Sequence, residues 1–257
     1  MDLQHQYIAF GTIVRREITR FTRIWTQTIV PPAVTTTLYF LIFGKLIGPR
    51  IGVVHGVPYI QYIVPGLVMM SIITSSYANV VASFYGSKFQ RNLDEMLVSP
   101  MPDYIIVLGY AAGGVARGLC VGTVVTLVAL CFVHLPVAHW GVMVSVCLLT
   151  SMLFAFAGLV NAIFANSFDD INIIPTFVLT PLTYLGGIFY SIDMLPDFWR
   201  GVSFVNPILY MVNGFRYGIL GLTDMSIGMA YTIIIGFTVV MFLLCLYLLK
   251  RGTGIRN

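Results

Sequence analysis

Side chains that could do chemistry are few in this chain, and their spacing matches no common catalytic motif. A phosphate-binding loop of the form G-x-x-x-x-G-K-[ST] would bind ATP, but the Gly44-Lys45 pair is followed by Leu46. Neither H-E-x-x-H, typical of zinc peptidases, nor G-x-S-x-G, typical of serine hydrolases, occurs in the chain. The sequence therefore predicts a protein that neither hydrolyses ATP nor catalyses a reaction of its own.

Metal ligands are also sparse. His134 and His139 lie close in sequence, but Pro136 separates them and no acidic residue is near, which favours loop histidines over a metal pair. Asp169 and Asp170 form the nearest approach to an acidic cluster, without a matching histidine. Their loop has two interpretations. The acids contact a partner, or Asp170 forms a capping box with Ser167 at the start of a helix.

The elements that must position these residues are long and apolar. Of the 257 residues, 58% are hydrophobic and 9% are charged, whereas a soluble domain has about 25% charged residues. A membrane-spanning helix needs about 20 apolar residues, and no carboxylate lies well within the stretches that qualify, so an ion-coupling carrier is missing. We predict an all-α polytopic membrane protein of one domain, with spans at 26–47, 59–82, 104–133, 140–164, 172–191 and 228–249.

Ahead of the first span, residues 7–29 have the pattern of an amphipathic helix. Apolar residues recur at steps of three and four, and arginines fall on the far side. This pattern favours a helix that lies in the membrane interface over a simple basic flank of the first span. The apolar stripe is Tyr7, Phe10, Val14, Ile18, Phe21 and Trp25, and the arginines are Arg15, Arg16, Arg20 and Arg23.

The distribution of Lys and Arg predicts the topology. Cytoplasmic loops are enriched in these residues, and both termini are therefore expected inside. Arg117, within the third span, has two interpretations: it meets an anionic substrate, or it extends to the inner headgroups. The nine basic residues expected inside are Arg15, Arg16, Arg20, Arg23, Lys88, Arg91, Lys250, Arg251 and Arg256, and the four expected outside are Lys45, Arg50, Arg200 and Arg216.

Residues 202–221 are apolar enough to suggest a seventh span. However, a central arginine such as Arg216 costs about 2.5–3.5 kcal/mol on insertion scales, and a seventh span would place Lys250 and Arg251 outside. We expect two short helices instead, broken at Asn206-Pro207 and dipping into the outer leaflet without crossing it.

One charged segment, 83–103, interrupts the apolar chain between the second and third spans. It predicts a short helix on which Arg91 can pair with Asp94 or Glu95. Ser99-Pro100-Met101-Pro102 ends it, because proline disfavours helix in the residue before it. Such a helix is either a solvated loop or the place where a partner binds.

The order of these elements resembles that of the ABC-2 type permeases, which are membrane subunits of bacterial ABC exporters. Two stretches carry most of the resemblance: FQRNLDEMLVSPMP, starting at Phe89, and the segment from Pro175 to Gly221. The resemblance covers essentially the whole chain. It implies the ABC-2, or type V exporter, fold as one transmembrane domain over 1–257, with a connecting helix at 1–25, a six-span bundle at 26–249 and a cytoplasmic tail at 250–257.

For function, the resemblance implies an exporter permease in the bacterial inner membrane that moves a drug, lipid or glycan-like substrate. Two copies of a separate ABC ATPase would drive it, so ATP and Mg would be bound there, and this chain would need no cofactor, metal or nucleic acid. Homodimers in membrane lipid are expected. The alternatives are an ATP-independent channel or facilitator, and a lipid-modifying membrane enzyme, which would need an acid, histidine or metal cluster at one face.

The resemblance also assigns roles to residues. The ATPase would contact a coupling helix and the arginines of the connecting helix, Arg15, Arg16, Arg20 and Arg23. The coupling helix comprises Phe89, Gln90, Arg91, Asn92, Leu93, Asp94, Glu95, Met96 and Leu97. The translocation path, between the first and fifth helices of two copies, would include Tyr39, Phe177, Thr180, Thr183 and Tyr184, and the outer gate would include Pro196, Asn206 and Pro207.

Overall fold

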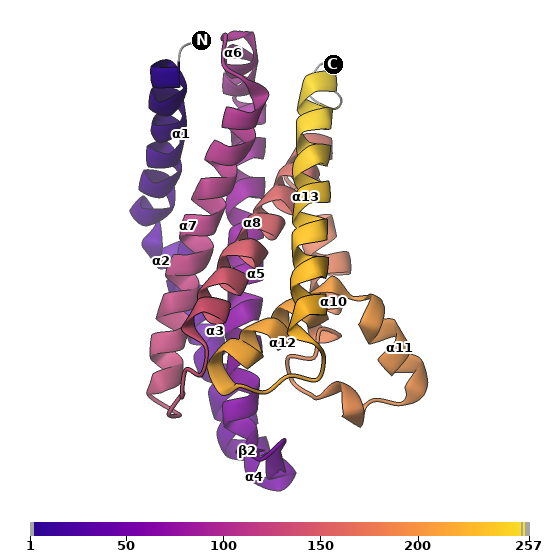
Figure 1. The fold of residues 1–257 in the computed structure, drawn as a ribbon. Coiled ribbons are helices and arrows are strands. Elements are labelled where there is room, and N and C mark those ends of the chain that lie inside the picture. The colour runs from indigo at the N-terminus through magenta and orange to yellow at the C-terminus, as the bar shows by residue number, and fades with distance from the viewer. Residues whose placement is uncertain (1–2, 253, 255–257) are drawn as a thin grey trace.

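Long helices run side by side through the computed structural model of the protein, which describes residues 3–252 and 254 (Figure 1). Arg256 of the topology prediction lies outside these residues, as do the side chains of Asp94 and Leu97. The first half comprises α1 (Leu3–Arg23), α2 (Trp25–Thr28), α3 (Val30–Tyr39), the π-helix η1 (Phe40–Ile47), α4 (Gly48–Ile51), the antiparallel strands β1 (Val53–Val54) and β2 (Val57–Pro58), α5 (Tyr59–Phe89), α6 (Asn92–Val98) and α7 (Asp103–Leu130).

The second half is also helical. It comprises α8 (Trp140–Phe164), α9 (Asp170–Ile174), the π-helix η2 (Pro175–Leu179), α10 (Thr180–Tyr184), the 3-10 helix η3 (Ile192–Met194), α11 (Asp197–Val205), α12 (Pro207–Leu220) and α13 (Ile227–Arg251). The described parts of α1, α6 and α13 reach the same end of the bundle, and β2 and α4 lie at the opposite end (Figure 1).

Five helical segments among the described residues are long and apolar enough to cross a membrane: Trp25–Ile51, Tyr59–Phe89, Asp103–Leu130, Trp140–Phe164 and Ile227–Arg251. They confirm the all-α polytopic fold. The predicted span 172–191 is only partly helical, since α9, η2 and α10 are three consecutive five-residue segments. At 1.5 Å per residue they reach roughly 22 Å, short of the bilayer's hydrocarbon core of about 30 Å. A count of six spans therefore stays a prediction.

The break predicted at Asn206-Pro207 is confirmed, because α11 ends at Val205 and α12 begins at Pro207. Residues 202–221 form no membrane-spanning candidate among the described helices. Pro207 favours this break for two reasons. Proline is common at the first position of a helix, and it disfavours helical backbone in the residue before it, here Asn206. The depth of these two helices in the outer leaflet stays a prediction.

Helix α5 lies at the centre of the bundle and packs closely on α8. Its most apolar window is 78% buried, the highest value among the five span candidates. Gly158 of α8 permits the contact, because a Cβ atom there would lie 2.6 Å from the carbonyl oxygen of Tyr77. That oxygen belongs to the backbone of α5, so a side-chain rotation cannot relieve the clash.

We expect Gly158→Ala to destabilise the protein by about 1–3 kcal/mol through overpacking. The matched control is Gly236→Ala in α13, where the new Cβ atom would meet nothing within 4 Å. Alanine favours a helix over glycine by about 1 kcal/mol, so this control should be neutral or stabilising. The thermal midpoint of the detergent-solubilised protein measures the difference. Equal midpoints for the two variants would contradict the proposed close packing.

Helix α1 packs on α7 through Ile13 and Glu17, both buried. Glycines again permit the approach, since a Cβ atom at Gly113 would lie 2.4 Å from the Cβ atom of Glu17. Tyr7 and Ile18 of the predicted apolar stripe are exposed and so remain free to face lipid. The predicted amphipathic helix is confirmed as a helix, whereas its position in the membrane interface stays a prediction.

Candidate functional site

The predicted coupling segment lies at the end of the bundle that holds α6 (Figure 1). The sequence suggested one helix over residues 89–97, but the structure divides this segment between two helices. Phe89 is the last residue of α5, and Arg91 adopts a left-handed conformation with φ of 60° before α6 starts at Asn92. That conformation costs a non-glycine residue roughly 1–2 kcal/mol. Leu93, 1% exposed, anchors α6 in the core, and burial of such a side chain offsets the cost.

The outward face of this segment carries polar and apolar side chains. Glu95, Arg91, Gln90 and Asn92 are exposed, and Met96 is half-buried. Of the two acids predicted to pair with Arg91, only Glu95 has a described side chain, and no ion pair joins it to Arg91. The charges of this face are therefore available to a partner.

An aromatic cluster joins this segment to the second loop at the same end. The ring of Phe168 packs edge-on against Tyr85 and Phe89, with centroid distances of 4.9 Å and 5.2 Å. Phe89 is 67% exposed and Phe168 is 53% exposed. Sequence reasoning missed Phe168, although an aromatic residue in so short and polar a loop was the available signal.

The capping-box interpretation of the second loop is confirmed. The backbone N–H groups of Asn166 and Ser167 donate to Oδ2 of Asp170 at 2.9 Å and 3.1 Å, and the N–H of Asp170 donates to Oγ of Ser167 at 3.1 Å. The hydrogen bond from Asn166 is the largest cause of a lowered pKa for the Asp170 carboxyl. The box orders the loop that presents Phe168.

The residues assigned to the translocation path separate into two sets. The hydroxyls of Tyr39 and Tyr184 lie 3.2 Å apart and directly join α3 of the first predicted span to α10 of the fifth. Phe177 and Thr180 are exposed, whereas Thr183 is buried and donates a hydrogen bond to the carbonyl of Leu179. Both helices contain π-helical turns, η1 after Tyr39 and η2 before Thr180, a feature found often at functional sites.

Helix α5 supplies a groove that sequence reasoning did not identify. Between Thr74 and Ala82 only Thr74, Ala78 and Ala82, spaced four residues apart, are exposed. Two cavities share Thr74 in their walls. One, of about 260 Å³, lies between α3 and α5, and the other, of about 270 Å³, lies between α5 and the consecutive elements α9, η2 and α10, here called the α9–α10 helix. The first cavity also includes Tyr39 and the second Thr180. The available signal was the spacing of small residues along one helical face.

The residues predicted to form an outer gate connect α10, α11 and α12. Oδ1 of Asn206 accepts a hydrogen bond from the N–H of Ile208 at 3.0 Å and caps α12, and its Nδ2 donates to the carbonyl of Leu182 at 2.6 Å. Pro196 precedes α11, and Pro207 opens α12. A movement of α12 would therefore be transmitted to α10.

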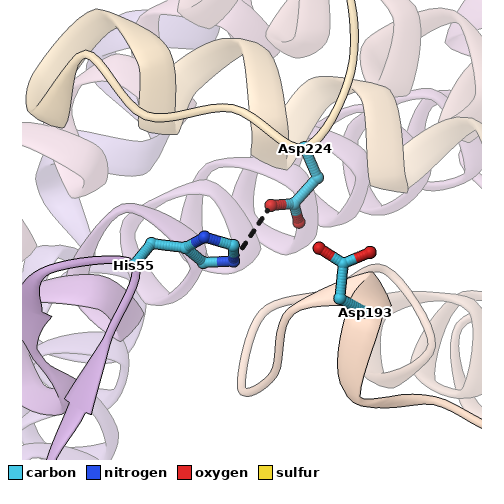
Figure 2. A group of neighbouring side chains, drawn as sticks. All are labelled: His55, Asp193 and Asp224. Atoms are coloured by element: carbon cyan, nitrogen blue, oxygen red, sulfur yellow. Dashed lines mark ion pairs between the residues drawn. The ribbon is translucent and has the colours of Figure 1, made fainter.

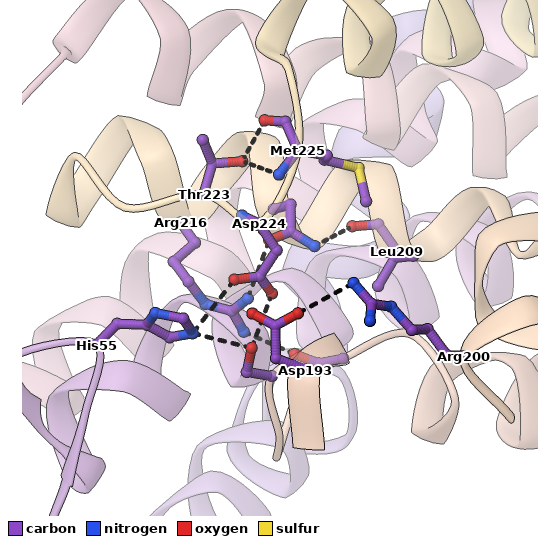
Figure 3. Close-up of polar contacts among 11 residues, drawn as sticks. His55, Asp193, Arg200, Leu209, Arg216, Thr223, Asp224 and Met225 are labelled. Carbon is purple, nitrogen blue, oxygen red and sulfur yellow. Dashed lines mark hydrogen bonds and ion pairs between the residues drawn. The ribbon is translucent and has the colours of Figure 1, made fainter. Parts of the chain in front are cut away.

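Arg216 of α12 is completely enclosed, with 1% of its surface exposed. Its Nη2 donates to the carbonyl of Gly187 at 2.6 Å and its Nη1 to Oδ1 of Asn213 at 3.3 Å. Its guanidinium carbon lies 4.0 Å from the ring centroid of Tyr62. Figure 3 shows this guanidinium beside Asp224.

A polar cluster joins three segments that are distant in sequence, with His55, Asp193 and Asp224 pointing toward one another (Figure 2). Nε2 of His55 lies 2.9 Å from Oγ of Ser191 and 3.4 Å from Oδ1 of Asp224. Three of its ligand-type atoms lie within 4.8 Å of one another, as in a metal site. However, Arg200 donates to Asp193 at 3.2 Å and Arg216 lies near Asp224, so arginines already balance both carboxylates (Figure 3). The arrangement serves as an ionic link between segments.

Comparisons with known proteins give a consistent result. A model of the ABC-2 type transporter family matches residues 8–220. The inner membrane transport permease YadH of Escherichia coli (strain K12) is 54% identical over 256 residues, covering 99% of this chain and 100% of that protein. Nodulation protein J of Rhizobium leguminosarum bv. viciae is 26% identical over 218 residues, covering 83% of each chain. Nodulation protein J of Sinorhizobium fredii (strain NBRC 101917 / NGR234) is 27% identical over 220 residues, covering 84% of this chain and 82% of that protein.

Proposed function

Since the chain belongs to the ABC-2 type transporter family and is a transport permease, we propose that a separate ATPase drives it as the membrane subunit of an exporter. The observation that carries this proposal is the surface formed by Phe89, Arg91, Phe168 and α6, here named the coupling surface. It combines exposed aromatic rings with a carboxylate, Glu95, and a guanidinium, Arg91. Aromatic residues and arginine are enriched at the energetic centres of protein interfaces.

The coupling surface is mechanically joined to the bundle. Phe89 is the last residue of the long helix α5, and Leu93 anchors α6 in the core. A push from a docked ATPase would therefore act directly on α5, whose other end contacts the outer segment where Gly66 packs on Ile188. A passive facilitator would need no ATPase, and the coupling surface would have no role in it.

Two copies of the chain would enclose the path. The exposed stripe of α5 at Thr74, Ala78 and Ala82 lies between the two helices that carry Tyr39 and Tyr184. A second copy facing this groove would complete a channel, and the contact of the two tyrosines lies along it. ATP binding need supply only a few kcal/mol of differential affinity to shift such a two-state equilibrium. These contacts do not identify the transported substrate.

Sidedness is part of the proposal. The excess of Lys and Arg at the end that holds α1 and α6 supports a cytoplasmic position for the coupling surface and for both chain termini. An inner-membrane location is supported by the five span candidates and by the relation to an inner membrane transport permease. ATP and Mg would be bound by the partner.

The proposal is tested by gentle extraction of the tagged chain from its native membrane, with mass spectrometry of the proteins that accompany it. We expect an ATPase in near-equal amount. Glu95→Lys should reduce that amount, because it reverses an exposed charge of the coupling surface. Asp197→Lys, an exposed acid in α11 at the other end, should leave the amount unchanged. Extraction without an ATPase, under conditions that preserve other membrane complexes, would contradict the proposal.

A further inference from the structure

A large cavity lies between α1 and the adjoining half of α5, and four arginines line it. Its volume is about 680 Å³, within the range of about 300–1,000 Å³ typical of ligand sites. Hydroxyl groups of Thr12, Thr19, Ser83 and Ser87 also line it, and the arginines are Arg15, Arg16, Arg20 and Arg23. We name it the arginine cavity.

The arginine cavity has an excess of positive charge. Glu17 is the only carboxylate among its lining residues, and it is fully buried. Its two oxygens are already engaged: Ser83 donates to Oε1, and Arg20 donates to Oε2 at 3.2 Å. Arg16 lies 3.5 Å from Oε1. One negative charge therefore faces four positive charges, and Arg117 of α7 adds electrostatic repulsion with Arg20.

Donors remain unused around this cavity. Across residues 3–252 and 254, neither Arg15 nor Arg23 has a hydrogen bond or ion pair. The Nε atom of Arg20 is buried and has no hydrogen-bond partner. Buried polar groups normally find a partner, so this donor leaves one hydrogen bond open at the wall of the cavity. Guanidinium donors around one space match the acceptor oxygens of a phosphate.

The arginine cavity also adjoins the groove along α5. Ala82 lines both the arginine cavity and the neighbouring cavity beside the α9–α10 helix, and Thr74 joins that cavity to the one at Tyr39. Apolar side chains, among them Val81, Ile171 and Leu179, line the neighbouring cavity. A molecule with an anionic head in the arginine cavity could thus place its apolar part along an apolar surface.

We infer that the arginine cavity binds the phosphate of an anionic, lipid-like molecule and forms the inner entrance of the transport groove. The second half of this inference rests on the proposed function, whereas the binding site itself does not. The same phosphate chemistry has two sources, a lipid headgroup or a soluble phosphate compound. The apolar lining of the adjoining cavity favours the lipid.

The test measures lipid binding to the full chain, purified without an ATPase, in nanodiscs of phosphatidylcholine containing a minor fraction of phosphatidylglycerol. Native mass spectrometry counts the lipids retained by the protein. The double variant Arg15→Gln/Arg23→Gln should lower the retained ratio of phosphatidylglycerol to phosphatidylcholine about ten- to thirtyfold, since each basic residue near an anionic surface contributes about 1 kcal/mol. Both arginines lack intramolecular partners, so folding should be unaffected.

The matched control is Lys45→Gln/Arg50→Gln, which removes two exposed charges from the opposite end of the bundle. It should keep the wild-type ratio. An equal loss in both double variants, or an unchanged ratio in the first, would overturn the binding site. A second variant, Thr19→Asp, should also lower the ratio by adding a negative charge inside the arginine cavity.

Inorganic phosphate, added at millimolar concentration, distinguishes the two sources. Retention of phosphatidylglycerol would support a lipid as the ligand. Its complete displacement would overturn the assignment to a lipid in favour of a soluble phosphate compound. The outcome is independent of the ATPase. Loss of selective lipid binding in a protein that still co-purifies with an ATPase would overturn this inference alone, whereas selective binding without any ATPase would overturn only the proposed function.

Discussion

Replacing Phe89 with alanine should release the ATPase from the extracted complex while the permease keeps its thermal midpoint. The ring is 67% exposed, so its removal opens no cavity in the core. It packs edge-on against Phe168 at 5.2 Å, which holds it in one orientation before a partner arrives. Truncation of a central aromatic residue at an interface costs at least about 2 kcal/mol, or about thirtyfold in affinity.

The chain offers a close control for this variant. Phe198 in α11 is 72% exposed and packs edge-on against Trp199 at 5.3 Å, so it is an exposed aromatic residue with an aromatic neighbour at the other end of the protein. Phe198→Ala should leave the ATPase bound, and Phe168→Ala should weaken it. If quantitative pull-down found the same ATPase yield for Phe89→Ala and wild type, the coupling surface would be wrongly assigned.

Replacing Arg216 with methionine should destabilise the protein by about 3–5 kcal/mol, the usual cost of removing one member of a buried charged network. The variant loses the hydrogen bond to the Gly187 carbonyl and the contact with the face of Tyr62. A hydrogen bond from a charged donor contributes about 1.5–3 kcal/mol, and a desolvated cation–π contact about 2 kcal/mol. The carboxylate of Asp224 would also lose its neighbouring positive charge.

Fluorescence-detected size-exclusion chromatography after heating measures this effect as a lower thermal midpoint, or as loss of the monodisperse peak. Arg200→Met is the control, because Arg200 is exposed and its ion pair with Asp193 lies at the surface, where such pairs contribute about 0–1 kcal/mol. Arg216→Lys should fall between the two, since it keeps the charge but loses the planar fork. A midpoint for Arg216→Met equal to that of Arg200→Met would refute a structural role for the buried guanidinium.

Much of the fold could be predicted because the relevant signals are local. A run of apolar residues predicts a span wherever it occurs, since backbone groups in lipid must be paired within the same helix. The break at Asn206-Pro207 and the capping box at Ser167 likewise depend on residues adjacent in sequence. The central arginine, Arg216, argued against a seventh span because burial of a charge in lipid is costly at any such position, and no span candidate among the described helices covers residues 202–221.

Other features were missed because no local signal specifies them. The chain reverses at Arg91 in a left-handed conformation without a glycine to announce it, and burial of Leu93 by the rest of the bundle favours that conformation. Helix α10 of the fifth predicted span ends at Tyr184, well before residue 191, where the span was predicted to end. Gly187, with φ of 71°, follows it, and Arg216 from a later helix binds its carbonyl.

By itself, therefore, the sequence determined the all-α membrane fold, the amphipathic first helix, the charged segment between the second and third spans, and the family. Only the tertiary structure decided the coupling surface, the ionic link at His55 and the arginine cavity. Glu17 of α1 accepts a hydrogen bond from Ser83 of α5, and Gly113 of α7 leaves the room that the Glu17 side chain occupies. Hydropathy and helical period act along the chain over a few residues, whereas a site depends on which helical faces pack together, and that choice involves side chains from every helix at once.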